Sequence, residues 1–192
     1  MSPIAITLLI TSVLFVLYII IIYNRLVNLK HNAGMAWSNI EVLLKQRHDE
    51  LPKLVETCKQ YMSYERDTLE AVMRARQAVS DAQQTTDLPA LGQAESQLRL
   101  GLGRLFAVAE AYPELRASDN FRHLETRITG LENAIADRRE FYNDSVNMNN
   151  VRIEQFPDVL IARMFNFGPF RLLEFTEPEK QDVDLARLFR EP

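Results

Sequence analysis

Residues 4–22 read IAITLLITSVLFVLYIIII, a run without a charge, a glycine or a proline. At about 1.5 Å per residue, a helix of this length covers about 28 Å, close to the thickness of bilayer hydrocarbon. A helix also pairs its own backbone polar groups, which lipid cannot do. Tyr18 and Tyr23 lie near one end, where amphipathic rings favour the membrane interface. The run predicts a transmembrane anchor over residues 1–22.

The flanking residues favour an uncleaved anchor over a signal peptide. A signal peptide has a basic start and small residues at its cleavage site, and residues 1–3 carry no basic side chain. Arg25 and Lys30 follow the run, and no acidic residue precedes Glu41. The positive-inside rule therefore predicts a single-pass protein with its N-terminus outside and the rest of the chain in the cytoplasm.

The composition is that of one helical domain behind the anchor. The chain has 192 residues, and removing the anchor leaves about 170, enough for a single core. Glycine and proline number only six and eight, and the runs between the prolines are rich in helix formers. The net charge of −4 argues against a nucleic-acid partner. The single cysteine, Cys58, excludes an intramolecular disulfide.

Apolar residues recur every three or four positions from the anchor onwards, which predicts an all-α fold. We expect the anchor to continue into an elongated antiparallel bundle of about four long helices over residues 23–156. Pro52 predicts a kink or short break. Ser63, Asp87 or Thr86, and Ser118 are the expected helix caps. The expected helices are 23–61, 63–82, 88–112 and 118–156.

The expected lengths differ in a way that bears on assembly. Short loops make neighbouring helices antiparallel, so the two long helices lie side by side. They reach about 58 Å, whereas the two middle helices reach only about 30–38 Å. One half is therefore a four-helix bundle, and the membrane-proximal half has only two helices. Two helices cannot bury a full apolar stripe, so a second copy, the segment 156–175 or a partner must cover them.

Asparagines gather in the two-helix half and predict a self-associating seam, because buried amides fix register and copy number. Asn28, Asn32 and Asn39 share one helix face, and Asn143, Asn147 and Asn150 share another. The alternative is that these amides face water. The predicted interface for a homo-oligomer or partner consists of Asn28, Asn32, Trp37, Asn39, Arg138, Tyr142, Asn143, Asn147, Asn149 and Phe156.

The segment 157–175 is short and aromatic, and the expected return of the last helix brings it close to the bilayer. Its rings, with Arg163 and Arg171 among them, fit either the lipid headgroup zone or a cover over the open side of the bundle. Residues 176–192 form an acidic tail that is either a disordered end or a docking peptide carrying Leu185, Leu188 and Phe189. The membrane-proximal aromatic residues are Phe165, Phe167, Phe170 and Phe175.

No constellation in the sequence points to catalysis. None of the three histidines, His31, His48 and His123, pairs with a second ligand at a metal-binding spacing. Cys58 has no histidine at a local spacing and fits a core position better than a nucleophile. We therefore predict no enzyme activity, no catalytic residue, no cofactor and no metal. A membrane-bound hydrolase would require His48 and Arg47 to converge with acidic residues in a pocket.

Several longer stretches resemble the LemA family of bacterial membrane proteins. The resemblance begins at residues 23–30 and 36–57, and includes Tyr64-Glu65, residues 68–72 and Ala109 with residues 112–115. It continues through residues 121–124, 132–138, Tyr142-Asn143 and Phe156-Pro157, and does not extend past residue 176. It implies a single-pass inner-membrane protein with an all-α bundle. It implies no activity, since the biochemical role of the family is not established.

These observations predict a non-catalytic scaffold that is anchored in membrane lipid, associates with itself and docks a membrane protein of unknown identity. The alternative is a signal-transmitting adaptor that switches between two packings at the Pro52 kink. Crosslinking from single introduced cysteines tests self-association of the scaffold, and a Pro52→Ala variant tests the switching adaptor.

Overall fold

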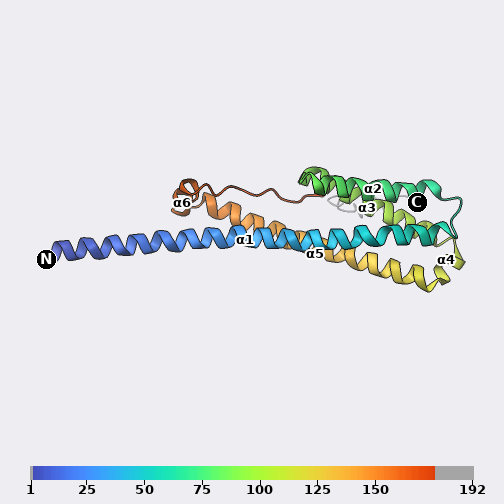
Figure 1. Ribbon diagram of the computed structural model, residues 1–192, viewed down its shortest axis with the longest axis horizontal. Helices are drawn as coiled ribbons and strands as arrows, with labels where there is room; N and C mark the ends of the chain where they lie inside the picture. Colours follow the sequence, from blue (N-terminus) through green and yellow to red (C-terminus); the bar gives the residue numbers. More distant parts are fainter. Residues whose placement is uncertain (1, 176–192) are drawn as a thin grey trace, which may run out of the picture. The chain divides into compact units, whose positions relative to one another are not determined.

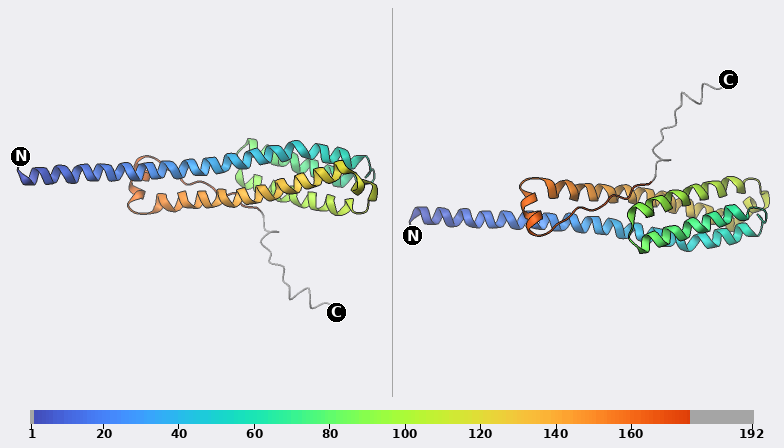
Figure 2. Two further views of the ribbon diagram at one scale, coloured as in Figure 1. Left: turned by 90° about the horizontal axis from the view of Figure 1, so that it is seen from below. Right: turned by 90° about the horizontal axis from the view of Figure 1, so that it is seen from above.

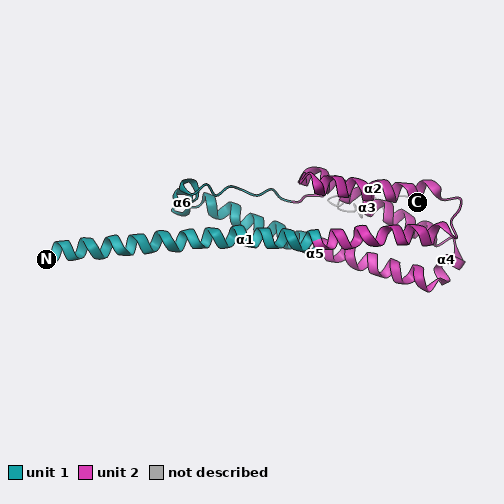
Figure 3. Ribbon diagram, viewed as in Figure 1, with its two compact units in different colours: residues 1–41, 137–172 teal, residues 42–136, 173–192 magenta. Residues whose placement is uncertain are grey.

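The computed structural model describes residues 2–175, so the predicted docking peptide in the tail lies outside the described residues. Within that range the chain is all-α, as expected (Figure 1). Its described residues form two compact units, residues 2–41 with 137–172, and residues 42–136 with 173–175 (Figure 3). We call them unit 1 and unit 2. The helices are α1 (Pro3–Lys59), α2 (Arg66–Gln84), α3 (Leu88–Ala109), α4 (Pro113–Ala117), α5 (Asp119–Glu154) and α6 (Asp158–Met164).

Helix α1 joins the apolar N-terminal run to the bundle without interruption. It is long and apolar enough near its N-terminus to cross a membrane, and none of that segment is buried by the rest of the chain. Pro52 lies inside the helix, so the short break expected there does not occur. Leu51 and Leu54, on either side of the proline, are completely buried. Packing of these neighbours holds the helix together where one backbone hydrogen bond is missing.

Unit 2 contains the four-helix part of the molecule. Helices α2 and α3 form an antiparallel pair within it, together with the later part of α1 and the earlier part of α5 (Figure 2). The apolar stripes predicted from the sequence are buried here. The fully or almost fully buried core residues include Leu44, Leu51, Leu54, Val72, Leu91, Leu98, Leu105, Leu115, Phe121 and Ile128.

Unit 1 contains only two long helical stretches, the first part of α1 and the last part of α5, as the helix lengths predict. Its third layer is the chain that follows α5. Helix α6 closes one end, and an extended segment then runs back along the two helices (Figure 2). We call residues 165–172 the strap. Of the three covers expected for this half, the structure shows the chain's own aromatic segment.

The helix ends follow the predicted capping residues in two cases out of three. The Asp87 side chain accepts a hydrogen bond from Ala90 N–H at 3.2 Å, and Ser118 Oγ accepts one from Phe121 N–H at 3.4 Å. The prediction for Ser63 is wrong. Helix α2 begins only at Arg66, because the residues after α1 form tight turns that bond back to the carbonyl of Cys58.

The third helix ends earlier than predicted. Helix α3 ends at Ala109 and not at residue 112, and the separate short helix α4 starts at Pro113, which occupies its first position. Proline lacks the backbone donor that a continuous ladder would need, whereas a helix start leaves that donor unpaired in any case. The chain therefore turns between residues 109 and 113, where α3 ends and α4 begins.

Candidate functional site

The strap is attached to α5 by side chains that bond to its backbone. Asn150 Nδ2 donates to the carbonyl of Phe170 at 2.9 Å, and Phe170 N–H donates to Asn150 Oδ1 at 2.9 Å. Asn149 Nδ2 donates to the carbonyl of Gly168 at 3.4 Å. An extended segment without a neighbouring strand has no ladder for its polar groups. The two amides supply part of that ladder from a helix.

Tyr142, about two turns away from these amides on α5, also holds the strap. Its hydroxyl donates to the carbonyl of Arg171 at 2.9 Å, and its ring packs against Trp37 of α1 with centroids 5.5 Å apart. Burial raises the pKa of the Tyr142 hydroxyl. The group therefore remains a neutral donor at physiological pH, which suits a bond to a carbonyl oxygen.

A tight turn after α6 directs the strap back along the helices. Asn166 adopts the left-handed conformation with φ of 59°, and Phe167 N–H donates to the carbonyl of Ala162 at 2.9 Å. Asparagine accepts this conformation more readily than most residues, and the bond is the one that closes a Schellman motif. Phe165 and Phe167 then both lie against Tyr23 of α1, with ring centroids 4.8 and 5.7 Å away.

The predicted interface residues fall into two groups. The chain itself engages Tyr142 and Asn149, which are buried, and Trp37 and Asn143, which are half-buried. The exposed members are Asn28, Asn32, Asn39, Arg138, Asn147 and Phe156. Among the aromatic residues predicted near the membrane, Phe165 is exposed, and Phe167, Phe170 and Phe175 are half-buried.

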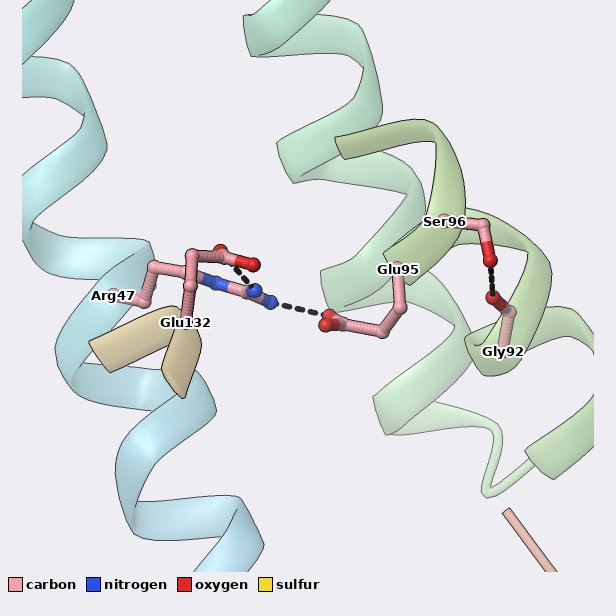
Figure 4. Close-up of polar contacts among 5 residues, drawn as sticks. All are labelled: Arg47, Gly92, Glu95, Ser96 and Glu132. Carbon is pink, nitrogen blue, oxygen red and sulfur yellow. Dashed lines mark hydrogen bonds and ion pairs between the residues drawn. The ribbon is translucent and has the colours of Figure 1, made fainter. Parts of the chain in front are cut away.

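Unit 2 contains a buried charge cluster that the sequence did not reveal. Arg47 of α1 is 1% exposed and donates to Glu132 of α5 at 2.6 Å and to Glu95 of α3 (Figure 4). Burial lowers the pKa of Arg47, but the two carboxylates outweigh that effect and the net shift is upward. The sequence feature that could have indicated this cluster is the place of Arg47 in the apolar stripe of α1, because a buried charge needs partners.

Ser96 lies beside this cluster on α3, and its hydroxyl donates to the carbonyl of Gly92 at 3.0 Å (Figure 4). Gly92 has a second role, since an added Cβ would stand 1.8 Å from the carbonyl oxygen of Glu174. The chain that follows the strap therefore crosses α3 at the one residue that allows it to approach. Leu173, beside that crossing, is 1% exposed.

The candidate hydrolase residues do not converge. His48 of α1 lies against Arg76 of α2, whose Nε donates to the His48 carbonyl at 2.9 Å and whose Nη2 is 2.5 Å from His48 Nε2. Burial lowers the pKa of His48, and the nearby positive charge of Arg76 lowers it further. Arg47, one residue away, is engaged instead by Glu95 and Glu132.

Cys58 is completely buried, and burial, with the charge of Glu125, raises the pKa of its thiol to about 12. A thiol with that pKa is neither a nucleophile nor a metal ligand near neutral pH. Among residues 2–175, no group of three or more His, Cys, Asp and Glu side chains lies in a position to hold a metal ion.

The chain resembles two groups of known proteins. Magnetosome protein MamQ of Magnetospirillum gryphiswaldense is 25% identical over 178 residues, covering 81% of this chain and 65% of that protein. Magnetosome protein MamQ 2 of Paramagnetospirillum magneticum is 26% identical, covering 93% and 74%. Protein LemA of Metamycoplasma hominis is 26% identical over 165 residues, covering 86% and 74%.

The sequence pattern that defines the LemA family matches residues 36–186. That match extends ten residues past the limit at 176 that the resemblance had indicated, so the expected end of the family pattern was wrong. It covers well over half of the chain and includes α2 to α6, the strap and the buried charge cluster, while the part of α1 before residue 36 lies outside it. The protein belongs to the LemA family.

Proposed function

We propose that this protein is a non-catalytic, membrane-anchored helical scaffold that associates with itself and docks a membrane protein. The observation that carries the proposal is the continuity of α1. One unbroken helix runs from the apolar residues of the span to Lys59 and contributes core residues to both units. Because the same helix is the anchor and a part of the bundle, no loop or linker separates the predicted span from the bundle.

The state of the reactive side chains supports a role without catalysis. The buried arginine is paired with two glutamates, His48 is held by a second arginine, and the Cys58 thiol is protonated. Each of these groups has a structural partner or environment, and none is directed at a common reacting atom. The unbroken helix through Pro52 likewise favours a scaffold over an adaptor that switches there.

Self-association is supported by an exposed face of α1. Asn28, Asn32, Met35 and Asn39 are all exposed and follow one another at steps of four, three and four residues. That spacing is the seam of a coiled coil, and amides at such positions select register and copy number. Gly34 lies beside this face, and nothing is within 4 Å of a Cβ added there, so a second helix can approach closely.

Single cysteines in native membranes test the self-association. Cys58 is buried and protonated, so it does not compete in disulfide formation. Asn28→Cys and Asn39→Cys should form disulfide-linked dimers under mild oxidation, whereas the exposed control Gln77→Cys on α2 should not. Equal and negligible crosslinking at all three positions would contradict the proposed seam.

We place the protein in the bacterial inner membrane with the N-terminus outside and the bundle in the cytoplasm, on the charges that follow the span. Protease added to spheroplasts, whose inner membrane is accessible from outside, should leave the bundle uncut, and protease added to inverted inner-membrane vesicles should degrade it. The opposite pattern would reverse the orientation. Photocrosslinking in these membranes, followed by mass spectrometry, identifies the docked membrane protein.

A further inference from the structure

Helix α6 lies against the last turn of the predicted membrane span. Ile161, Ala162 and Phe167 form one apolar cluster with Ile22 of α1, and Ile19 packs against the same cluster. The uncharged run of nineteen residues ends at Ile22 and has about the length of the bilayer hydrocarbon. If that run spans the bilayer, the cluster lies at the boundary between hydrocarbon and headgroups, and α6 lies there with it.

The other side of the same short segment is apolar and exposed. Leu160 is 58% exposed and Met164 63%, four residues apart and hence on one face of α6. Phe156 and Phe165, on either side of the helix, are 80% and 50% exposed. We call these four residues the collar. Single exposed apolar residues are common on proteins, but four large ones within ten residues of sequence, on and beside one short helix, point to an interaction surface.

We propose that the collar inserts into the interfacial zone of the phospholipid bilayer and fixes the depth at which α1 is held. The proposal depends on the membrane anchor of the proposed function. It follows from continuity, because the collar and the span are joined through one apolar cluster and through the ring contact between Tyr23 and Phe165. Exposed arginines at positions 25 and 163 flank the collar, where their side chains can reach lipid phosphates.

A lipid surface suits the collar better than a second protein copy does. Helix α6 has only seven residues, and one of its faces is already used against α1. The remaining face is too short for a helix–helix seam, whereas insertion of a few large apolar side chains is what interfacial segments do. Tyr23, an interfacial residue type in its own right, lies directly beneath the collar ring Phe165.

Tryptophan scanning in lipid vesicles tests the proposal with the full-length chain. The native indole is first removed by Trp37→Phe, and single tryptophans are then placed at Leu160→Trp, Met164→Trp and Phe15→Trp. The matched control is Phe141→Trp on α5, which is 54% exposed and lies about 22 Å along α5 from Phe156. Two sets of vesicles of phosphatidylcholine and phosphatidylglycerol are used. One contains lipids brominated near the glycerol end of the acyl chain, which quench tryptophans at the depth expected for the collar, and the other contains lipids brominated near the methyl end, which quench tryptophans near the centre of the bilayer.

The expected result is about a twofold loss of emission at the two collar positions with glycerol-end bromine and at Phe15→Trp with methyl-end bromine, and no loss at Phe141→Trp with either lipid. Collar tryptophans that stay bright in brominated lipid and are quenched by aqueous iodide would place the collar in water and overturn the inference. Collar tryptophans that neither quencher reaches would show that protein, such as a second copy, covers the collar, which also overturns it. A Phe15→Trp that stays bright in both brominated lipids would instead refute the membrane anchor itself.

Discussion

Replacement of Arg47 by methionine tests whether the buried charge cluster holds α1, α3 and α5 together. Arg47→Met keeps the length of the side chain but removes the guanidinium that Glu95 and Glu132 share. Removing one partner from a buried ion pair costs about 3–5 kcal/mol. Glu132 retains 18% side-chain exposure and can recover some hydration, so we expect a loss near the lower end, about 3 kcal/mol.

The measurement is urea unfolding of the full chain in detergent micelles, followed by far-ultraviolet circular dichroism. With an m-value of about 2 kcal/mol per molar urea, a loss of about 3 kcal/mol lowers the midpoint by about 1.5 M. The matched control is Arg122→Met, because Arg122 pairs with Asp119 at the surface, where the two side chains are 62% and 93% exposed. An exposed pair of this kind contributes less than about 1 kcal/mol.

A triple variant separates the attraction between the charges from the penalty of leaving carboxylates behind. Arg47→Met combined with Glu95→Met and Glu132→Met removes the whole cluster, and apolar replacement of a complete buried triad is often neutral or stabilising. We expect its stability to return to within about 1 kcal/mol of the parent. Equal losses for Arg47→Met and Arg122→Met, or a triple variant less stable than the single one, would refute the reasoning.

Three further changes test the strap and the α1–α2 contact. Gly92→Ala puts a Cβ 1.8 Å from a backbone carbonyl and should destabilise the fold by about 1–3 kcal/mol, whereas Gly103→Ala on the same helix, with nothing within 4 Å, should stabilise it by about 0.5–1 kcal/mol. If thermal unfolding shows the same shift for both, the crossing is not as tight as described. Asn150→Ala removes two hydrogen bonds to the strap and should speed amide exchange in residues 165–172 by about 5–30-fold, while the exposed Asn147→Ala should leave exchange unchanged. Burial, and then the neighbouring guanidinium, lower the pKa of His48 from its ordinary 6.5, so the unfolded chain binds this proton more readily. Stability should therefore be fully present above about pH 7 and should fall as the pH drops below the unfolded pKa, and this slope should be smaller in His48→Gln; identical slopes would contradict the assignment.

The sequence sufficed to predict the features that depend on periodicity and length. The apolar stripe of α1 and the seam from Phe121 to Ile135 are buried where three- and four-residue spacing placed them. The difference in helix length correctly divided the long pair into a two-helix part and a four-helix part. Arg138 and Phe156 are exceptions, because both continue the same three- and four-residue register and are nevertheless exposed. Periodicity describes a helix face but not where the neighbouring element ends.

Features that depend on which groups meet in three dimensions were not predictable in the same way. The position of Arg47 in an apolar stripe indicated that it needs partners, but neither Glu95 nor Glu132 is marked among the 26 acidic residues of the chain. The failure of Ser63 as a cap has a similar cause. A capping residue is recognised in the sequence by its type, but its backbone must also be able to adopt the capping conformation. Here the residues directly before Ser63 form the turns that end α1.

The asparagines of the two-helix half show why a buried amide does not by itself identify an interface. Asn149 is buried and Asn150 half-buried, as expected of amides that set register between copies, yet both bond to backbone groups of the same chain. A helix covered by an extended segment has to provide donors and acceptors that a sheet would otherwise supply. These two amides of α5 are therefore explained within one copy, and among the predicted interface amides the exposed Asn28, Asn32 and Asn39 of α1 and Asn147 of α5 remain to be explained by a second copy.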